Sequence, residues 1–311
     1  MIDVIFRIVF PLVLLGFIII IFFSGLSNRN SQEMFMSFDE FLKDWLKDHG
    51  QASKVEEQFA KMKKDPSGKL YMPITYGGAK IFIKLGLSPN KASYINLIAS
   101  FFIFWGVIMA SAGHSLDLMT QQPLYGSWFF VLALLVLATG IGDGIDGAIA
   151  RLLDIKSKTG AWLDNILDRV SDILMLVCLV PTNLLVFPTY GLDFTWMVWT
   201  NIFLIFIYEY MRARHEGLGL LETKPFIGER ITRVIVNATF YVMYGVSSIV
   251  VLLTNLIDPS ATIWNSSHAW TIAWSMFIYQ ISLLVIMILS MALFAKYIWK
   301  NLKKLEQAEI K

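Results

Sequence analysis

Residues 128–151 read WFFVLALLVLATGIGDGIDGAIAR, an apolar run that ends in two aspartates and an arginine. The run favours a helix inside a membrane, because backbone amides without partners are costly in lipid. An ionised carboxylate at that depth costs several kcal/mol unless it is paired, hydrated or bound to a cation. The stretch therefore predicts a membrane helix with a functional site at its C-terminal end.

The end of this stretch places its acidic and small residues on one helical face. Residues spaced i, i+3, i+4 and i+7 lie on the same side of an α-helix. That spacing is met by Asp143, Asp146, Gly147 and Ala150. The small side chains leave room for a ligand to approach the backbone beside the two carboxylates.

A second acidic helix is expected directly afterwards. Gly160, Asp164 and Asp168 are spaced i, i+4 and i+8, and Asp172 follows one turn later. The short link at 152–159 makes the two helices antiparallel neighbours. Four carboxylates are therefore expected to converge, those of Asp143, Asp146, Asp164 and Asp168.

The chemistry of this cluster favours a hard divalent cation. Like charges this close need a counter-charge, and ligands that are all oxygen suit Mg²⁺, Mn²⁺ or Ca²⁺ better than zinc. Carboxylates with one or two Mg²⁺ or Mn²⁺ ions commonly hold a diphosphate and neutralise the charge that develops on it. The cluster therefore predicts phosphoryl transfer.

The composition indicates an all-α integral membrane protein. Of 311 residues, 56% are hydrophobic and 16% are charged, and the mean hydropathy is +0.59. A six-helix transmembrane core is expected, with one further N-terminal transmembrane helix and a cytoplasmic amphipathic segment. The expected spans are 4–25, 92–112, 126–150, 161–186, 196–213, 232–257 and 270–296. The net charge of +2 argues against a nucleic-acid partner.

Basic residues predict the orientation, because Lys and Arg are retained on the cytoplasmic side. The segments 113–125, 187–195 and 258–269 contain neither, whereas 26–91 contains eleven. The N-terminus is therefore expected outside, and the C-terminus and the aspartates at the cytoplasmic face. The expected parts are an anchor at 1–25, an amphipathic segment at 26–87, a transmembrane domain at 88–300 and a tail at 301–311.

The amphipathic segment has its own start and stop signals. Ser37 and Glu40 form a capping-box pattern before apolar residues at helical spacing, and 65–68 ends the pattern. Two arrangements are open. The helix lies in the membrane interface with Phe41 and Trp45 toward lipid, or it packs on the cytoplasmic face of the protein itself.

Four alternative roles for the acidic motif fit the sequence less well. Residues 142–147 satisfy G-x-G-x-x-G, but no strand precedes them, which disfavours a dinucleotide-binding fold. An EF-hand loop is not formed. Ion pairs with nearby basic residues explain one or two of the carboxylates, not four on two helices. A cation transporter with carboxylates along its path is the alternative that is not an enzyme.

The motif Asp143-x-x-Asp146-Gly147-x-x-Ala150-Arg151, eight residues, then Gly160-x-x-x-Asp164-x-x-x-Asp168, resembles the signature of the CDP-alcohol phosphotransferases. The resemblance implies a magnesium-dependent enzyme that transfers a phosphatidyl group from a CDP-linked lipid such as CDP-diacylglycerol to an alcohol and releases CMP. It also implies a homodimer.

The resemblance further implies a role for each residue of the motif. Metal ions would be held by Asp143, Asp146 and Asp164, with Asp168 as general base and a further metal ligand. The CDP-lipid would be bound by Gly147, Ala150, Arg151 and Gly160.

A basic cluster bears on the alcohol. Arg212, Arg230 and Arg233 follow or open expected spans, and guanidinium groups suit a phosphate. Alternatively, they anchor helices at lipid headgroups. The cluster resembles the prokaryotic phosphatidylinositol-phosphate synthase branch of the family, which implies inositol 1-phosphate as acceptor. Glu209 departs from that pattern, and glycerol 3-phosphate, inositol and serine remain open.

Overall fold

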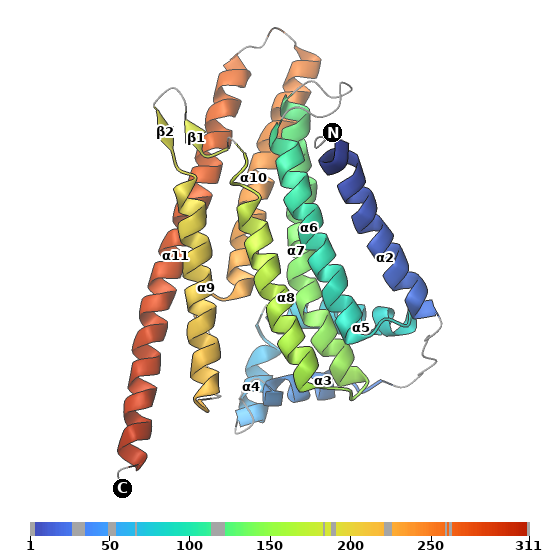
Figure 1. Ribbon diagram of the computed structural model, residues 1–311, viewed down its shortest axis with the longest axis vertical. Helices are drawn as coiled ribbons and strands as arrows, with labels where there is room; N and C mark the ends of the chain where they lie inside the picture. Colours follow the sequence, from blue (N-terminus) through green and yellow to red (C-terminus); the bar gives the residue numbers. More distant parts are fainter. Residues whose placement is uncertain are drawn as a thin grey trace. The chain divides into compact units, whose positions relative to one another are not determined.

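The computed structural model describes residues 4–26, 35–48, 54–65, 67–112, 122–182, 184–187, 191–220, 226–258, 260 and 263–309. These residues are nearly all helical (Figure 1). The α-helices are α2 (Phe10–Leu26), α3 (Phe38–Leu46), α4 (Val55–Met62), α5 (Met72–Lys84), α6 (Pro89–Ala112), α7 (Gln122–Leu152), α8 (Lys158–Val177), α9 (Trp196–Gly217), α10 (Arg230–Ile257) and α11 (Ile263–Glu309). Short π-helical turns η1 (Ile5–Val9) and η4 (Ser67–Tyr71) precede α2 and α5.

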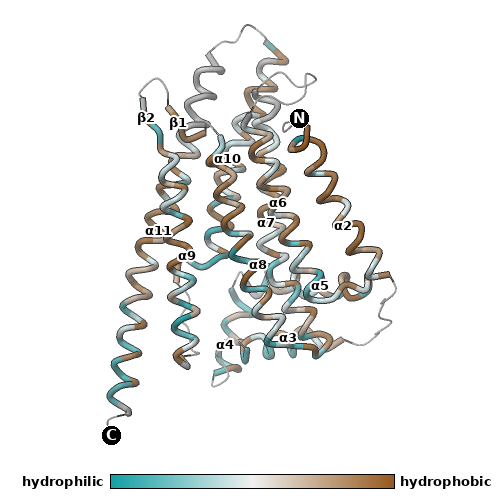
Figure 2. Tube along the Cα trace, in the orientation of Figure 1, coloured by the Kyte–Doolittle hydropathy of each residue, from teal (hydrophilic) through white to brown (hydrophobic). Residues whose placement is uncertain are grey.

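Among the described residues, five helical stretches are long and apolar enough to cross a membrane, as expected for a multi-pass membrane protein. They are Ile5–Leu26, Pro89–Ser111, Gly126–Leu152, Arg230–Thr254 and Trp274–Gln307. The other two of the seven predicted spans fall on α8 and α9. Both are helical, but their charged residues make them less apolar. By contrast, α2 is hydrophobic along most of its length, and α11 turns hydrophilic toward its C-terminal end (Figure 2).

The predicted span at 161–186 is wrong at its C-terminal end. The helix α8 ends at Val177, and turns follow it through Thr182. Pro181 explains the stop, because proline lacks an N–H and disfavours helical backbone in the residue before it. The chain continues into a short antiparallel hairpin of β1 (Val186–Phe187) and β2 (Leu192–Asp193), which was not predicted.

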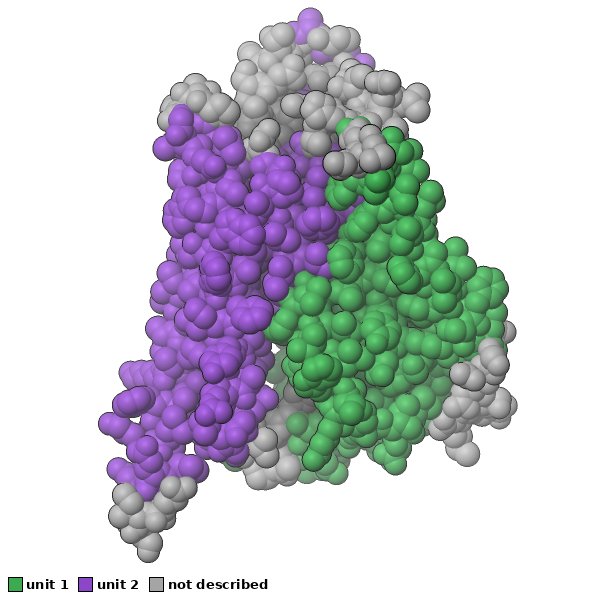
Figure 3. Space-filling model, viewed as in Figure 1, with its two compact units in different colours: residues 1–102, 138–171, 221–223 green, residues 103–137, 172–220, 224–311 purple. Residues whose placement is uncertain are grey.

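The chain divides into two compact units (Figure 3). Unit 1 contains residues 1–102, 138–171 and 221–223, and unit 2 contains 103–137, 172–220 and 224–311. The boundaries fall within α6, α7 and α8. The four aspartates of the motif belong to unit 1, and the three arginines of the basic cluster belong to unit 2.

The core of unit 1 joins the N-terminal segment to the motif helix. The cluster contains Phe41, Leu42 and Leu46 of α3, Met72, Ala79 and Ile83 of α5, and Ile145, Ala148, Ile149 and Leu152 of α7. Since Phe41 is only 1% exposed, α3 packs on its own protein. The alternative in which Phe41 faces lipid is therefore wrong for this side chain.

The predicted start of α3 is confirmed. The side chain of Ser37 accepts a hydrogen bond from the backbone N–H of Glu40, and the Glu40 carboxylate accepts one from the N–H of Ser37 at 2.8 Å. Lys43 with Glu56 at 2.7 Å, and Lys63 with Asp39 at 2.8 Å, then join α3 to α4 and the turn after it. The predicted amphipathic stretch thus contains two short helices, and residues 49–53 between them lie outside the described part.

The core of unit 2 is built on close helix contacts and buried aromatic rings. A Cβ at Gly245 of α10 would collide with the backbone of Phe130 in α7, so only glycine permits this approach. Asn201 of α9 donates to the side chain of Gln280 in α11 at 2.9 Å. Cys178 is buried beside Tyr241, with Sγ and Oη 3.7 Å apart, as expected for a packing residue.

Candidate active site

Three of the four predicted carboxylates meet in unit 1. One carboxylate oxygen from each of Asp143, Asp164 and Asp168 lies within 4.8 Å of the others. The end of α7 supplies the first residue, and the start of α8 supplies the other two. The two helices are joined by residues 153–157 and lie side by side (Figure 1). All three side chains are half-buried.

These three oxygens fit a single divalent cation. Metal–oxygen bonds are about 2.0–2.1 Å for Mg²⁺ and 2.3–2.6 Å for Ca²⁺, so two ligands of one ion are at most about 4–5 Å apart. The separations in the structure are at most 4.8 Å, which is within the limit for Ca²⁺ and at most slightly above that for Mg²⁺. The donors are also all carboxylates, the ligand type that hard cations prefer. The residues present therefore fit a hard divalent cation.

Asp146 occupies a different position in the cluster. It is 6% exposed and accepts hydrogen bonds from the hydroxyl of Ser93 and, at 2.6 Å, from the N–H of Gly147. Its side chain also contacts Asp164. Asp146 thus lies beside the group of three and is fixed by α6, whereas the predicted metal set treats all four aspartates alike.

Ser93 is a site residue that was not predicted. Local capping at the start of α6 accounts for the Ser-Pro-Asn sequence at 88–90, and no pattern links position 93 to position 146. In the structure Ser93 is buried and donates to Asp146 across 53 residues of sequence. A hydroxyl in a predicted membrane helix is the weak signal that was present, and it does not indicate the partner.

The glycines of the motif differ in what surrounds them. A Cβ at Gly142 would lie 2.7 Å from the side-chain oxygen of Asn96, and one at Gly144 would collide with the Tyr71 hydroxyl. These two glycines allow unit 1 to pack closely. At Gly147, apart from the adjoining residues and the backbone of the same helix, the only described atom within 4 Å of a Cβ is Nη1 of Arg151, at 3.0 Å. The carboxylate face of α7 is therefore open beside Gly147.

The remaining predicted nucleotide-binding residues lie at the two helix ends. Ser157 accepts a hydrogen bond from the N–H of Gly160 at 3.0 Å and so caps α8. Ala150 is half-buried in the last turns of α7. Arg151 has its Nε 3.1 Å from the Asp48 carboxylate, which was not expected. Gly160 and Arg151 thus sit beside the α7–α8 link.

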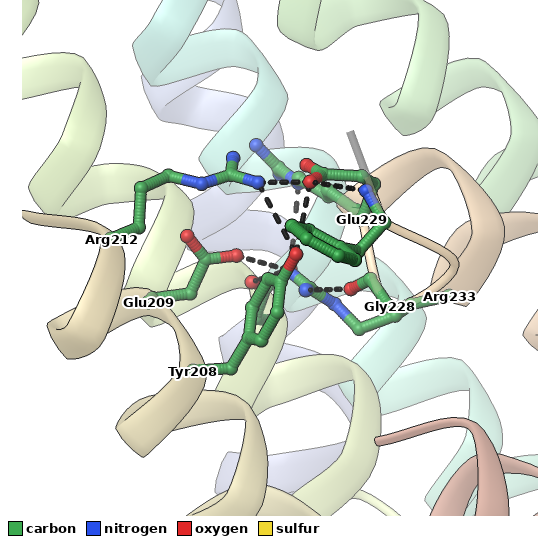
Figure 4. Close-up of polar contacts among 9 residues, drawn as sticks. Tyr208, Glu209, Arg212, Gly228, Glu229 and Arg233 are labelled. Carbon is green, nitrogen blue, oxygen red and sulfur yellow. Dashed lines mark hydrogen bonds and ion pairs between the residues drawn. The ribbon is translucent and has the colours of Figure 1, made fainter. Parts of the chain in front are cut away.

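The basic cluster of unit 2 is closely paired with acidic residues. Arg212 contacts Glu229, and the Tyr208 hydroxyl donates to the same carboxylate at 2.9 Å (Figure 4). Arg233 binds Glu209 at 2.9 Å and donates to the carbonyl of Gly228 at 2.7 Å (Figure 4). Both arginines were predicted to bind an acceptor phosphate, and in the structure each holds a carboxylate.

Asp172 completes this network. Its carboxylate oxygens lie 2.8 Å from Arg233 and 3.4 Å from Arg230. Asp172, Arg230 and Arg233 are all largely buried, with side chains 8%, 11% and 6% exposed. The three arginines therefore face three carboxylates, those of Asp172, Glu209 and Glu229. The Glu209 side chain, which departs from the pattern of the branch, is one of them.

His215 follows Arg212 in the sequence, where an imidazole serves as a proton shuttle only if its ring nitrogens reach a proton donor or acceptor. It is 1% exposed, and the rings of Phe294 and Tyr297 lie about 6 Å from its imidazole, at 6.0 and 5.9 Å between centroids. Neither ring nitrogen has a hydrogen-bond partner among the described residues. An apolar packing role describes it better.

The helices and the acidic site define a multi-pass membrane protein with a carboxylate cluster suited to a divalent cation. The chain belongs to the CDP-alcohol phosphatidyltransferase family, whose sequence profile matches residues 87–299. All four aspartates and all three arginines fall within the matched region. The N-terminal segment, with α2 to α5, precedes it.

The chain is also similar to two curated proteins and to a solved structure. An uncharacterised protein of Aquifex aeolicus is 40% identical over 103 residues, which is 30% of this chain and half of that protein. The archaetidylinositol phosphate synthase of Pyrococcus horikoshii is 29% identical over 163 residues, 50% of this chain and 70% of the relative. A crystal structure of Mycobacterium tuberculosis phosphatidylinositol phosphate synthase with CDP-DAG bound matches with TM-score 0.42 and 22% identity over 69% of this chain and 94% of the other.

Proposed function

We propose that this protein transfers a phosphatidyl group from CDP-diacylglycerol to inositol 1-phosphate and releases CMP. The observation that carries the proposal is the meeting of Asp143, Asp164 and Asp168 within ligand distance of one cation, at the positions of the family motif. Family membership supports the donor and the reaction class. The inositol 1-phosphate acceptor is supported by the name of the Pyrococcus relative.

In this mechanism Asp168 accepts the proton of the acceptor hydroxyl. The hydroxyl oxygen forms a bond to the lipid-bearing phosphorus, the bond from that phosphorus to the bridging oxygen breaks, and CMP leaves with the electron pair. Asp143, Asp146 and Asp164 are the proposed metal ligands, with Asp168 as a further one. Bound Mg²⁺ or Mn²⁺, one ion or two, supplies charge neutralisation at the diphosphate.

The nucleotide part of the donor is assigned to the open face of α7. Gly147 and Ala150 leave room for the cytidine, while Arg151 and Gly160 support it. The single described contact of a Cβ at Gly147 supports this assignment. We place the active site at the cytoplasmic face of the membrane, with the N-terminus outside and the C-terminus inside, and we propose that the protein acts as a homodimer.

The acceptor phosphate is assigned to Arg212, Arg230 and Arg233. Guanidinium groups bind phosphate through paired N–H donors, which supports this role. To bind there, the acceptor phosphate must displace carboxylates that these arginines already contact.

The pairing of these arginines with carboxylates favours a second candidate for the acceptor. Three arginines matched by three carboxylates carry no excess positive charge for a dianion. An acceptor without a phosphate, such as free inositol or serine, would not have to compete with them. The reaction would otherwise be identical.

An acceptor panel tests both candidates. Purified protein in lipid nanodiscs receives CDP-diacylglycerol, Mg²⁺ and one of inositol 1-phosphate, glycerol 3-phosphate, inositol or serine, and CMP release is measured. We expect CMP release with inositol 1-phosphate. CMP release with only inositol or serine would instead support the second candidate, an acceptor without a phosphate. Absence of release with every acceptor, together with cation flux in liposomes, would favour a transporter instead.

A further inference from the structure

The end of the motif helix is held by acidic residues from outside the family region. Arg151 Nε lies 3.1 Å from Asp48 and 3.9 Å from Asp44, which come from α3 and the turn after it. Lys156 in the α7–α8 link contacts the same two residues, at 2.6 Å from Asp44 and 3.0 Å from Asp48. Two acids and two bases thus form one balanced cluster in unit 1.

This cluster differs from a pair of mobile surface charges. The Arg151 side chain is only 12% exposed, and the two aspartates are 32% and 35% exposed. A guanidinium of low exposure that is hydrogen-bonded to a carboxylate is held more firmly than an exposed ion pair, whose contribution is small. For Lys156, burial opposes ionisation, but hydrogen bonds to Asp44 and Asp48 outweigh it and raise the lysine pKa.

The acidic residues are themselves fixed by the core. Leu42 and Leu46 of α3 are 0% and 5% exposed and belong to the same apolar cluster as Ile145 and Ile149 of α7. Ile145 and Ile149 are one turn apart on the packed side of α7. The motif residues at 143, 147 and 150 follow a different stripe of the same helix. Thus α3 packs against one side of α7, and the carboxylates lie on another side of the same helix.

The two ends of the Arg151 guanidinium have different surroundings. Its Nε faces Asp44 and Asp48, whereas its Nη1 lies 3.0 Å from the Cβ position of Gly147. The acids therefore orient the group so that its Nη end lies over the open face beside Gly147. The Nη groups of a guanidinium bind phosphate oxygens well, and the diphosphate of a nucleotide carries such oxygens.

We propose that Asp44 and Asp48 are positioning residues for nucleotide binding: they hold Arg151 over Gly147 so that it meets the diphosphate of the CDP-lipid. The inference rests on the proposed function, because it takes the open face of α7 as the nucleotide site. It makes the N-terminal segment, which precedes the family region, part of that site.

The test compares four variants of the full-length protein in nanodiscs. These are Asp48→Asn, Asp48→Glu, the double variant Asp44→Asn with Asp48→Asn, and the control Asp39→Asn. Asp39 lies in the same helix and pairs with Lys63 rather than with Arg151. Measurements are the KM for CDP-diacylglycerol and for the acceptor, kcat, the Kd of soluble CDP, and the unfolding temperature.

The double variant is expected to raise the KM for CDP-diacylglycerol and the Kd of CDP about fivefold to tenfold, the loss expected from one charge-assisted hydrogen bond that is partly exposed. The acceptor KM should not change, and Asp48→Glu, which keeps a carboxylate at this position, should retain most of the nucleotide affinity. Asp39→Asn should leave both nucleotide constants unchanged, even if it lowers the unfolding temperature.

Two outcomes would overturn the inference. Unchanged nucleotide constants with a lower unfolding temperature would make the contact purely structural. A lower KM for CDP-diacylglycerol and a lower Kd of CDP would mean that Asp44 and Asp48 compete with the diphosphate for Arg151. If the double variant does not fold, Asp48→Asn alone decides, since Asp44 still pairs with Lys156. Failure of the proposed function is distinct, because the wild type would then neither release CMP nor bind CDP.

Discussion

The acidic site of unit 1 and the basic cluster of unit 2 use the same kinds of side chain in opposite arrangements. In unit 1, the carboxylates of Asp143, Asp164 and Asp168 gather within 4.8 Å of one another. In unit 2, each carboxylate of the cluster contacts an arginine, as Glu229 contacts Arg212. Gathered like charges call for a cation, whereas matched charges are already compensated. The first arrangement is thus suited to binding a ligand, and the second to fixing helices until a ligand displaces a partner.

The largest expected effect comes from Asp168, the proposed general base. Asp168→Asn should lower kcat by about 10²- to 10⁴-fold, the usual contribution of proton transfer to a positioned side chain. CDP binding should be kept. The matched control is Asp154→Asn, an exposed residue of the α7–α8 link whose left-handed backbone, with φ of 54°, suits asparagine. A fully active Asp168→Asn enzyme would remove the base from the mechanism.

Metal binding tests the unit 1 arrangement without relying on activity. Mg²⁺ at a hundredfold excess over its Kd should stabilise the wild type by about 2.7 kcal/mol and raise its unfolding temperature. Asp143→Asn and Asp164→Asn should lose most of that shift, while Asp154→Asn keeps it. Chelation by EDTA should also stop CMP release, and added Mg²⁺ should restore it. Equal shifts in all four proteins would show that Mg²⁺ binds elsewhere.

Removing a carboxylate tests the matched charges of unit 2. Asp172→Asn leaves Arg230 and Arg233 with less compensation in a buried position, and a broken buried pair costs about 3–5 kcal/mol. Thermal unfolding should show this loss even without Mg²⁺, whereas the effect of the unit 1 variants appears only when Mg²⁺ is present. The exposed Asp65→Asn is the control. An unchanged unfolding temperature would contradict a structural role for the network.

The smallest expected effect concerns the acceptor. Glu209→Gln removes one negative charge from the side of Arg233, so the KM for inositol 1-phosphate should fall about threefold to tenfold. The KM for CDP-diacylglycerol serves as internal control and should stay constant. If the KM for inositol 1-phosphate does not change, the arginines of the basic cluster bind only the carboxylates of their own network. The cluster of unit 2 would then be purely structural, in contrast to the acidic site of unit 1.

Much of unit 1 follows from local sequence periodicity. The helical spacing of residues 143–150 and 160–168 and the short link between the helices predicted that carboxylates converge, as three of them do. The capping box at Ser37 was also predictable, because its partners are three residues apart. Patterns of this kind need no knowledge of the tertiary fold.

Contacts between distant segments were not predictable in the same way. Ser93 meets Asp146, and Asp48 meets Arg151, across 53 and 103 residues of sequence. Their pairing depends on how α3 and α6 pack against α7, which no periodicity encodes. The end of α8 was missed for a different reason, since apolar residues continue past Val177 and conceal the break before Pro181.

The pairing of Asp48 with Arg151 has a consequence for the order of events during synthesis. The ribosome makes Asp48 103 residues before its partner, an interval of about 5–20 s at about 5–20 residues per second. During that time the capping box allows α3 to form locally, but the apolar side of α3 lacks its cover from α7. The apolar side of α3 is therefore fully covered, and the proposed nucleotide-binding face completed, only when the α7–α8 link emerges.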